Sequence, residues 1–141
     1  MPNVMNILMR LSGQMRMILK VLREWFEQLP DERPTLGWRG MDVKQIARAL
    51  YGDEVFYGKE KRLLDSSVEV SLYRSLKRMR EHGLVVRDPW GGYWLRELLR
   101  PEIVRDWITW LGRRHREQLE RLKKLEGEIR RYIELAMELA R

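Results

Sequence analysis

The chain has 141 residues, a net charge of +7 and no cysteine, so it has room for one domain with an appendage and excludes disulfide bonds and thiolate chemistry. Neither a signal peptide nor the apolar run of about 20 residues that a membrane helix needs is recognisable, so we expect a cytoplasmic protein that binds no membrane. The charge favours a polyanionic partner, and the use of 21 Arg against 7 Lys, with only 2 Asn and 4 Gln, is typical of a thermophile or of a GC-rich genome.

The first predicted helix covers about residues 12–29 and ends at Pro30, before a loop that runs through Gly40. Its apolar residues follow helical spacing on one broad face. They are Met15, Ile18, Leu19, Leu22, Trp25, Phe26 and Leu29. A second helix begins after Asp42, a suitable N-cap, and ends at Gly52. Its expected core residues are Ile46, Ala47 and Leu50.

A long loop, residues 52–65, leads to a third helix over about residues 67–82. Ser66 and Glu69 have the spacing of a capping box, in which two side chains satisfy backbone N–H groups reciprocally, and Gly83 ends the helix. One stripe is apolar and comprises Val68, Leu72, Leu76 and Met79. The opposite face carries small residues first and cations further along, namely Ser67, Val70, Ser71, Arg74, Lys77, Arg78 and Glu81.

Residues 84–95 predict a tight two-stranded hairpin. Residues 84–87 and 93–95 have strand character, and Pro-Trp-Gly-Gly at residues 89–92 supplies the turn. Tyr93 and Trp94 alternate across the second strand, so we expect one of them to lie in the core. Arg87 and Trp90 are the candidates for an exposed tip. For Trp90, an exposed ring and a ring folded back on the domain are both consistent with the sequence.

From about Glu102, after Pro101, the pattern is helical to the C-terminus, and Gly112 permits a bend or a break. Apolar residues recur at alternating steps of three and four, which is the heptad seam of a coiled coil. We expect residues 1–100 to form one domain and residues 101–141 a helical dimerisation segment. Its expected interface residues are Ile108, Leu111, Leu122, Leu125, Ile129 and Tyr132. The predicted fold class is mainly α with a small β-hairpin.

The third helix and the hairpin together predict a DNA-binding surface. Small residues let the helix N-terminus enter the major groove, where its dipole favours phosphate. Arg74 is long enough to form two hydrogen bonds with a guanine edge, worth about 1–3 kcal/mol of discrimination, and Lys77 and Arg78 lie where phosphate contacts are expected. On the hairpin, Arg87 would contact the minor groove or a phosphate, and Trp90 a sugar edge. The alternative is a solvated charged face.

Two segments carry a family resemblance: Val-Lys-Gln-Ile-Ala-Arg-Ala-Leu-Tyr-Gly at residues 43–52, and Ser-Leu-Tyr-Arg-Ser-Leu-Lys-Arg-Met-Arg-Glu-His-Gly-Leu-Val at residues 71–85. Over about residues 15–96 the chain resembles the winged-helix transcription regulators of archaea and bacteria. The resemblance implies that Ser71–Arg74 reads the major groove, that Gly-Leu-Val opens the wing, and that a homodimer binds a two-fold operator. Tyr73 departs from the pattern, because many members of the family have a small residue there. The C-terminal helix is similar in architecture to archaeal winged-helix proteins that dimerise through a terminal coiled coil.

The sequence contains no Gly-rich phosphate loop, no nucleophile–base pattern and no clustered carboxylates, and His82 and His115 are too far apart to suggest a metal site. We therefore expect a protein that is not an enzyme and uses no metal and no cofactor, with double-stranded DNA as its partner. Two other functions remain open: a winged-helix protein–protein interaction module, and a non-specific, chromatin-like DNA-binding protein.

The loop at residues 52–65 also allows two interpretations. Its cations would contact the DNA backbone beside the third helix, or the loop is a flexible insertion in which nearby acids balance those cations. The cations are Lys59, Lys61 and Arg62, and the acids are Asp53, Glu54 and Glu60.

Overall fold

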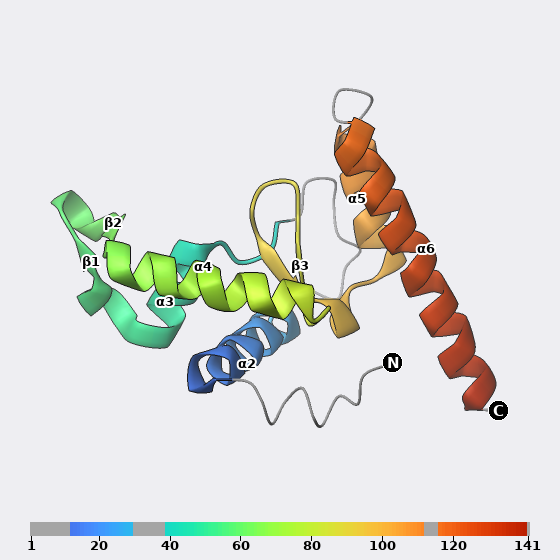
Figure 1. Ribbon diagram of the computed structural model, residues 1–141, viewed down its shortest axis with the longest axis horizontal. Helices are drawn as coiled ribbons and strands as arrows, with labels where there is room; N and C mark the ends of the chain where they lie inside the picture. The colour runs from blue at the N-terminus through green and yellow to red at the C-terminus, as the bar shows by residue number, and fades with distance from the viewer. Residues whose placement is uncertain (1–11, 30–38, 112–115, 141) are drawn as a thin grey trace. The chain divides into compact units, whose positions relative to one another are not determined.

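The computed structural model describes residues 12–29, 39–111 and 116–140 of the chain, which divides into two units. The described part of the first unit comprises residues 12–29 and 40–98, and that of the second comprises residue 39, residues 99–111 and residues 116–140. Within these residues the first unit has three α-helices, α2, α3 and α4, and two small antiparallel strand pairs, and the second has two α-helices, α5 and α6 (Figure 1). The expectation of a mainly helical chain with a small hairpin is confirmed.

The first two helices begin at the residues that the sequence indicates. Helix α2 spans Gly13–Glu27, and the Ser12 side chain accepts a hydrogen bond from the Met15 backbone at 3.3 Å. Helix α3 spans Val43–Tyr51, and Asp42 and Gln45 form a complete capping box at its start. The buried faces of both helices pack against α4 in one core.

Helix α4 spans Ser66–Glu81, and its N-cap is Asp65. The predicted capping box of Ser66 with Glu69 is therefore wrong. One carboxylate oxygen of Asp65 accepts hydrogen bonds from the backbone N–H groups of Ser67 and Val68, so Ser66 already lies inside the helix. The apolar stripe faces the core as expected, with Leu72, Leu76 and Met79 buried.

The hairpin after α4 consists of β3 (Val85–Arg87) and β4 (Tyr93–Leu95), paired antiparallel. Both Tyr93 and Trp94 are buried, so the expectation that only one of them lies in the core is wrong. Tyr93 joins the main core, whereas the ring of Trp94 meets that of Trp25 edge to face, with 5.0 Å between their centroids. Both faces of this strand are thus covered.

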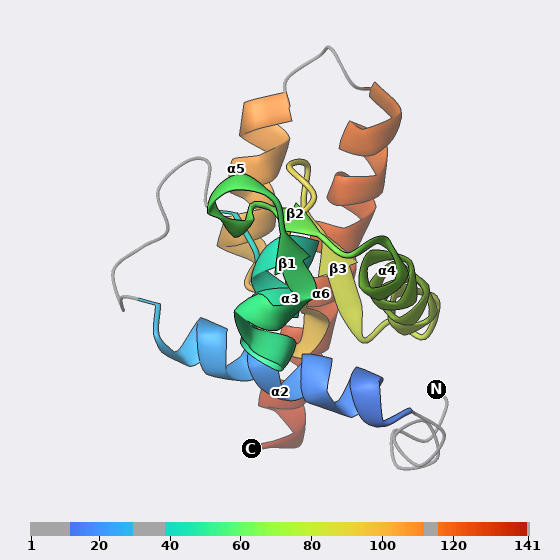
Figure 2. The same cartoon turned by 90° about the vertical axis from the view of Figure 1, so that its left-hand side faces the viewer.

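Residues 52–65, expected to be a loop, contain a second hairpin between α3 and α4 (Figure 2). A short 3₁₀ helix, η1 (Gly52–Val55), leads to β1 (Phe56–Tyr57), and a second, η2 (Lys59–Lys61), leads to β2 (Leu63–Leu64). The strands pair antiparallel, with Phe56 opposite Leu64, and both of these side chains enter the main core. The segment is folded because those two residues anchor it.

The second unit contains α5 (Pro101–Leu111) and α6 (Arg116–Leu139), which pack against each other side by side as an antiparallel pair (Figure 2). The helical pattern expected from about residue 102 onward corresponds to these two helices, and residues 112–115, where a bend or a break was allowed, lie outside the described residues. The apolar face of α5 is buried against the heptad seam of α6 in the same chain. None of the helices in the described ranges is long and apolar enough to span a bilayer.

Candidate functional site

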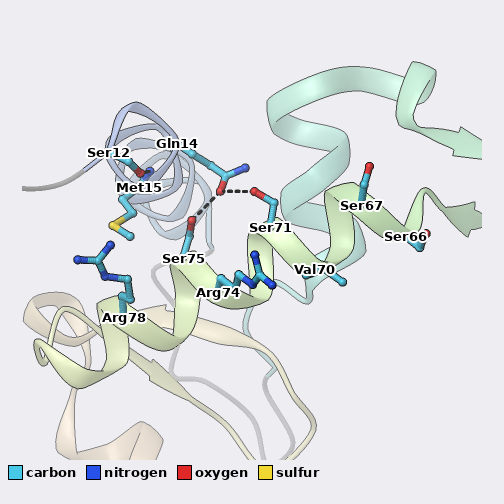
Figure 3. Close-up of a pocket in the computed structure, with 10 residues that line it drawn as sticks. All are labelled: Ser12, Gln14, Met15, Ser66, Ser67, Val70, Ser71, Arg74, Ser75 and Arg78. Atoms are coloured by element: carbon cyan, nitrogen blue, oxygen red, sulfur yellow. Dashed lines mark hydrogen bonds between the residues drawn. The ribbon is translucent and has the colours of Figure 1, made fainter.

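An open pocket of about 680 Å³ lies between the N-terminal end of α2 and the exposed side of α4 (Figure 3). Its walls come from Ser12, Gln14 and Met15 at the start of α2, and from Ser66, Ser67, Val70, Ser71, Arg74, Ser75 and Arg78 of α4. Of the predicted DNA-binding residues, this pocket brings together Ser67, Val70, Ser71, Arg74 and Arg78. Lys77 is exposed on α4 but does not line the pocket.

Arg74, Lys77 and Arg78 form what we call the basic face of α4. All three side chains are exposed, and none has an ion-pair partner among the described residues. Figure 3 shows Arg74 and Arg78 projecting from the same side of α4, about one turn apart. Two of its three cations, Arg74 and Arg78, are therefore exposed along the pocket without a partner among the described residues, and Lys77 is exposed beside it.

The N-terminal end of α4 is less attractive to anions than the sequence predicts. The Ser67 hydroxyl and the Val68 backbone both donate to the Asp65 carboxylate and lower its pKa, so Asp65 is negatively charged where the helix begins. This charge offsets the positive end of the helix dipole. Attraction for phosphate must come from the basic face.

Gln14 was missed by sequence reasoning, although it joins three helices. Its Oε1 accepts hydrogen bonds from the hydroxyls of Ser75 at 2.6 Å and Ser71 at 3.2 Å (Figure 3). Its Nε2 donates to the Tyr51 hydroxyl at 2.9 Å. The only signal in the sequence is a polar residue beside Met15 on the inner side of α2. We call Gln14, Tyr51, Ser71 and Ser75 the Gln14 network.

Two of the serine hydroxyls that line the pocket already donate hydrogen bonds within the protein. The hydroxyl of Ser71 donates to Gln14, and that of Ser67 donates to Asp65, so both protons are used within the protein. Val70 is exposed in the same stretch. Arg74 is the first long charged side chain after these small residues along α4, and it is exposed in the pocket.

The β3–β4 turn is organised by Asp88, a second residue that sequence reasoning missed. Asp88 is 4% exposed, and its carboxylate accepts hydrogen bonds from four N–H groups. These are the backbone N–H groups of Gly40 (2.6 Å), Trp90 (2.9 Å) and Gly92 (2.8 Å) and the Trp94 indole (3.0 Å). An Asp followed by Pro-Trp-Gly is the one sequence signal for such a turn.

Arg87 and Trp90 do not form an equally exposed tip. Arg87 is exposed, and its guanidinium lies 6.0 Å from the centre of the Tyr93 ring, beside Gly91. Trp90 is half-buried and its indole nitrogen is covered. Of the two interpretations, the ring folded back on the protein fits better, which leaves Arg87 as the group at the hairpin available to a partner.

The predicted dimerisation residues are largely covered within one chain. Leu111, Leu122 and Ile129 are buried, Ile108 and Leu125 are half-buried, and Tyr132 is 58% exposed. Further along α6 the exposed apolar side chains are Leu135, Met137 and Leu139, the last 79% exposed. The sequence alone could not separate the part of the seam that α5 covers from the part that stays open.

Glu126 joins the two helices of the second unit. It accepts hydrogen bonds from Arg105 of α5 at 3.1 Å and from Arg130 of α6 at 2.9 Å. Partial burial acts to raise the pKa of Glu126, but the hydrogen bonds from Arg130 and Arg105 outweigh it and lower the pKa. The carboxylate is therefore charged at neutral pH and links α5 to α6.

No protein-family model, curated protein or solved structure gives a match to this chain. Within residues 12–29, 39–111 and 116–140, no group of three or more His, Asp and Glu side chains gathers as a possible metal site. The expected absence of a metal, a cofactor and a catalytic activity stays a prediction.

Proposed function

We propose that this chain is a winged-helix DNA-binding transcription regulator that places α4 in the major groove and uses β3–β4 as its wing. The observation that carries the proposal is the basic face: Arg74, Lys77 and Arg78 are exposed and have no ion-pair partner among the described residues. The phosphates of double-stranded DNA are a regular array of anions that such a face fits.

Each residue of the face has a proposed role. Arg74 pairs with a guanine edge, and the exposed Val70 contacts a thymine methyl group. Lys77 and Arg78 bind phosphates and so position the helix without specifying sequence. Arg87 of the wing contacts the backbone or the minor groove.

The proposal includes a homodimer, formed by the open end of α6. Because Arg105 pairs with Glu126, the start of α5 lies about level with Arg130, and the remaining turns of α6 extend beyond it. Tyr132, Leu135 and Leu139 share one stripe of this extension and are exposed. A second copy would cover this stripe.

Charge favours an antiparallel arrangement of the two copies. Arg131 and Glu138 flank the stripe on the same side, seven residues apart. Two antiparallel helices bring each Arg131 close to Glu138 of the partner subunit, whereas two parallel helices place these groups on opposite sides of the seam. An operator with two-fold symmetry follows from a symmetric dimer.

The test of DNA recognition is selection from random double-stranded DNA at about 150 mM salt. Wild type is compared with the double variant Arg74→Ala, Arg78→Ala and with a control of equal charge loss on α6, Lys123→Ala, Lys124→Ala. Enrichment of a two-fold motif by wild type and control, lost in the first variant, supports the proposal. Salt-sensitive binding without enrichment would favour the chromatin-like function, and no binding would favour the protein-interaction module.

Cysteine cross-linking tests the dimer, and the chain contains no native cysteine to interfere. In the antiparallel arrangement, residue 135 lies near the two-fold axis, so Leu135→Cys should form an intersubunit disulfide. The two copies of Leu139→Cys would be about 13 Å apart along the axis, beyond the reach of a disulfide. Cross-linking of both variants would indicate a parallel dimer. Cross-linking of neither would show that the exposed stripe at the end of α6 is not a dimer interface.

A further inference from the structure

The β1–β2 hairpin has two different faces. Phe56 and Leu64 lie opposite each other and are buried in the main core. Their neighbours Tyr57 and Leu63 also lie opposite each other but point outward, and they are 55% and 51% exposed. An aromatic and an aliphatic side chain thus form an uncovered pair beside the basic turn of the hairpin.

The hairpin is attached to its surroundings at several points. The Arg48 guanidinium lies over the Phe56 ring at 4.3 Å, and it donates hydrogen bonds to Asp53 at 2.9 Å and to the Lys61 carbonyl at 3.3 Å. The Asp65 backbone N–H donates to the Val55 carbonyl at 2.9 Å. These contacts fix the hairpin at the N-terminal end of α4 (Figures 1 and 2).

The turn between the strands is held in an unusual conformation. Glu60 and Lys61 have φ values of 58° and 50°, in the left-handed region that residues with a side chain rarely adopt. The Lys61 backbone N–H donates to the Gly58 carbonyl at 3.1 Å, and the contact from Arg48 holds the other side of the same residue. The turn therefore presents its side chains from a defined backbone.

Three of the four acids of residues 52–65 are engaged in local structure, whereas two of the cations, Lys59 and Lys61, are not. Asp53 pairs with Arg48, Glu60 pairs with Arg62, and Asp65 caps α4. Glu54 lies in η1, at the opposite end of β1 from the turn. Lys59 and Lys61 are exposed and have no ion-pair partner among the described residues. The flexible, charge-balanced insertion is thus the weaker of the two sequence interpretations.

We propose that the β1–β2 hairpin is a second DNA-backbone contact, with Lys59 and Lys61 binding phosphates beside the groove that receives α4. Tyr57 and Leu63 pack on the sugar edge of the same strand. The hairpin lies at the N-terminal end of α4 and the β3–β4 wing at its C-terminal end, so the two flank the reading helix (Figure 1). This inference rests on the proposed function, and it extends the stretch of DNA that each subunit contacts beyond the N-terminal end of α4.

The test compares the full-length double variant Lys59→Gln, Lys61→Gln with a charge-matched control, Lys123→Gln, Lys124→Gln. The DNA is the sequence that wild type selects and, separately, an unrelated duplex. Loss of two phosphate contacts should reduce the slope of log affinity against log salt by about 2 on both DNAs, because each contact contributes about 0.9. The preferred sequence should not change, and hydroxyl-radical protection should shrink at one edge of each half-site.

Each result supports or overturns a specific statement. A hairpin variant with the slope and footprint of the control would overturn the second contact while leaving DNA binding by α4 intact. Absence of DNA binding by wild type would overturn both proposals. If wild type and the hairpin variant bind DNA alike but only the variant loses a protein partner, the hairpin is a protein-docking surface instead.

Discussion

Two carboxylates, one in the described part of each unit, join several groups by opposite means. Asp88, in the first unit, is buried and accepts only from neutral N–H groups of residues 40–94. Glu126, in the second unit, is held by the charged guanidinium groups of Arg105 and Arg130. The first arrangement resists salt and fixes a turn rigidly, whereas the second depends on ionisation and is screened in water.

The largest effect is expected from Asp88→Ala. The change leaves four N–H groups without their acceptor, at about 1–3 kcal/mol for each one that water cannot reach. Allowing for relaxation, we expect a loss of at least about 3 kcal/mol in the free energy of unfolding, measured by urea denaturation. Asp88→Asn keeps one oxygen acceptor and should lose less. Equal stability of Asp88→Ala and wild type would show that the β3–β4 hairpin does not depend on this carboxylate.

Replacing a glycine with alanine should change the free energy of unfolding in opposite directions in the two units. A Cβ at Gly92 would lie 2.6 Å from the Asp88 carboxylate and from the Gly40 backbone, so Gly92→Ala should destabilise by about 1–3 kcal/mol. Gly127 lies inside α6 with nothing within 4 Å of such a Cβ, so Gly127→Ala should stabilise by about 1 kcal/mol. Thermal unfolding of both variants measures the difference, and losses of similar size would contradict it.

The smallest effect concerns the pH dependence of the second unit. Because the pKa of Glu126 is lowered in the folded chain, its contribution is present above the unfolded value, about 4.5, and is lost as pH falls through the folded value. Glu126→Gln should therefore lower stability by less than about 1 kcal/mol at pH 7, and the difference from wild type should vanish near pH 3. A difference that persists at low pH would assign it to packing instead.

The sequence predicts well those elements whose signals are local. The apolar stripe of α4, the Asp42 cap and the strands β3 and β4 lie where spacing and turn residues place them. The wrong N-cap has a local cause, because Asp65 and Ser66 are adjacent residues that both favour this position. Asp65 is the N-cap because its carboxylate accepts hydrogen bonds from two backbone N–H groups of the first turn.

The remaining features depend on contacts between distant residues. β1 and β2 have two residues each, too few to display alternation, and the turn between them uses Glu60 and Lys61 where the sequence signal would be glycine. A heptad seam does not say whether its partner helix is in the same chain, so the pairing of α5 with α6 was missed. Gln14 acts through hydrogen bonds that no spacing rule reveals, and the only sequence signal for Asp88 is its position directly before the turn residues.

The Gln14 network has a consequence for protein engineering. Two hydroxyls of α4 are oriented by a side chain from α2, and that side chain is itself held by Tyr51 at the end of α3. Grafting the outward residues of α4 onto another scaffold would transfer Arg74 but would leave Ser71 and Ser75 without their acceptor. The smallest portable unit for redesign is therefore the three-helix assembly, with position 14 chosen together with positions 71 and 75.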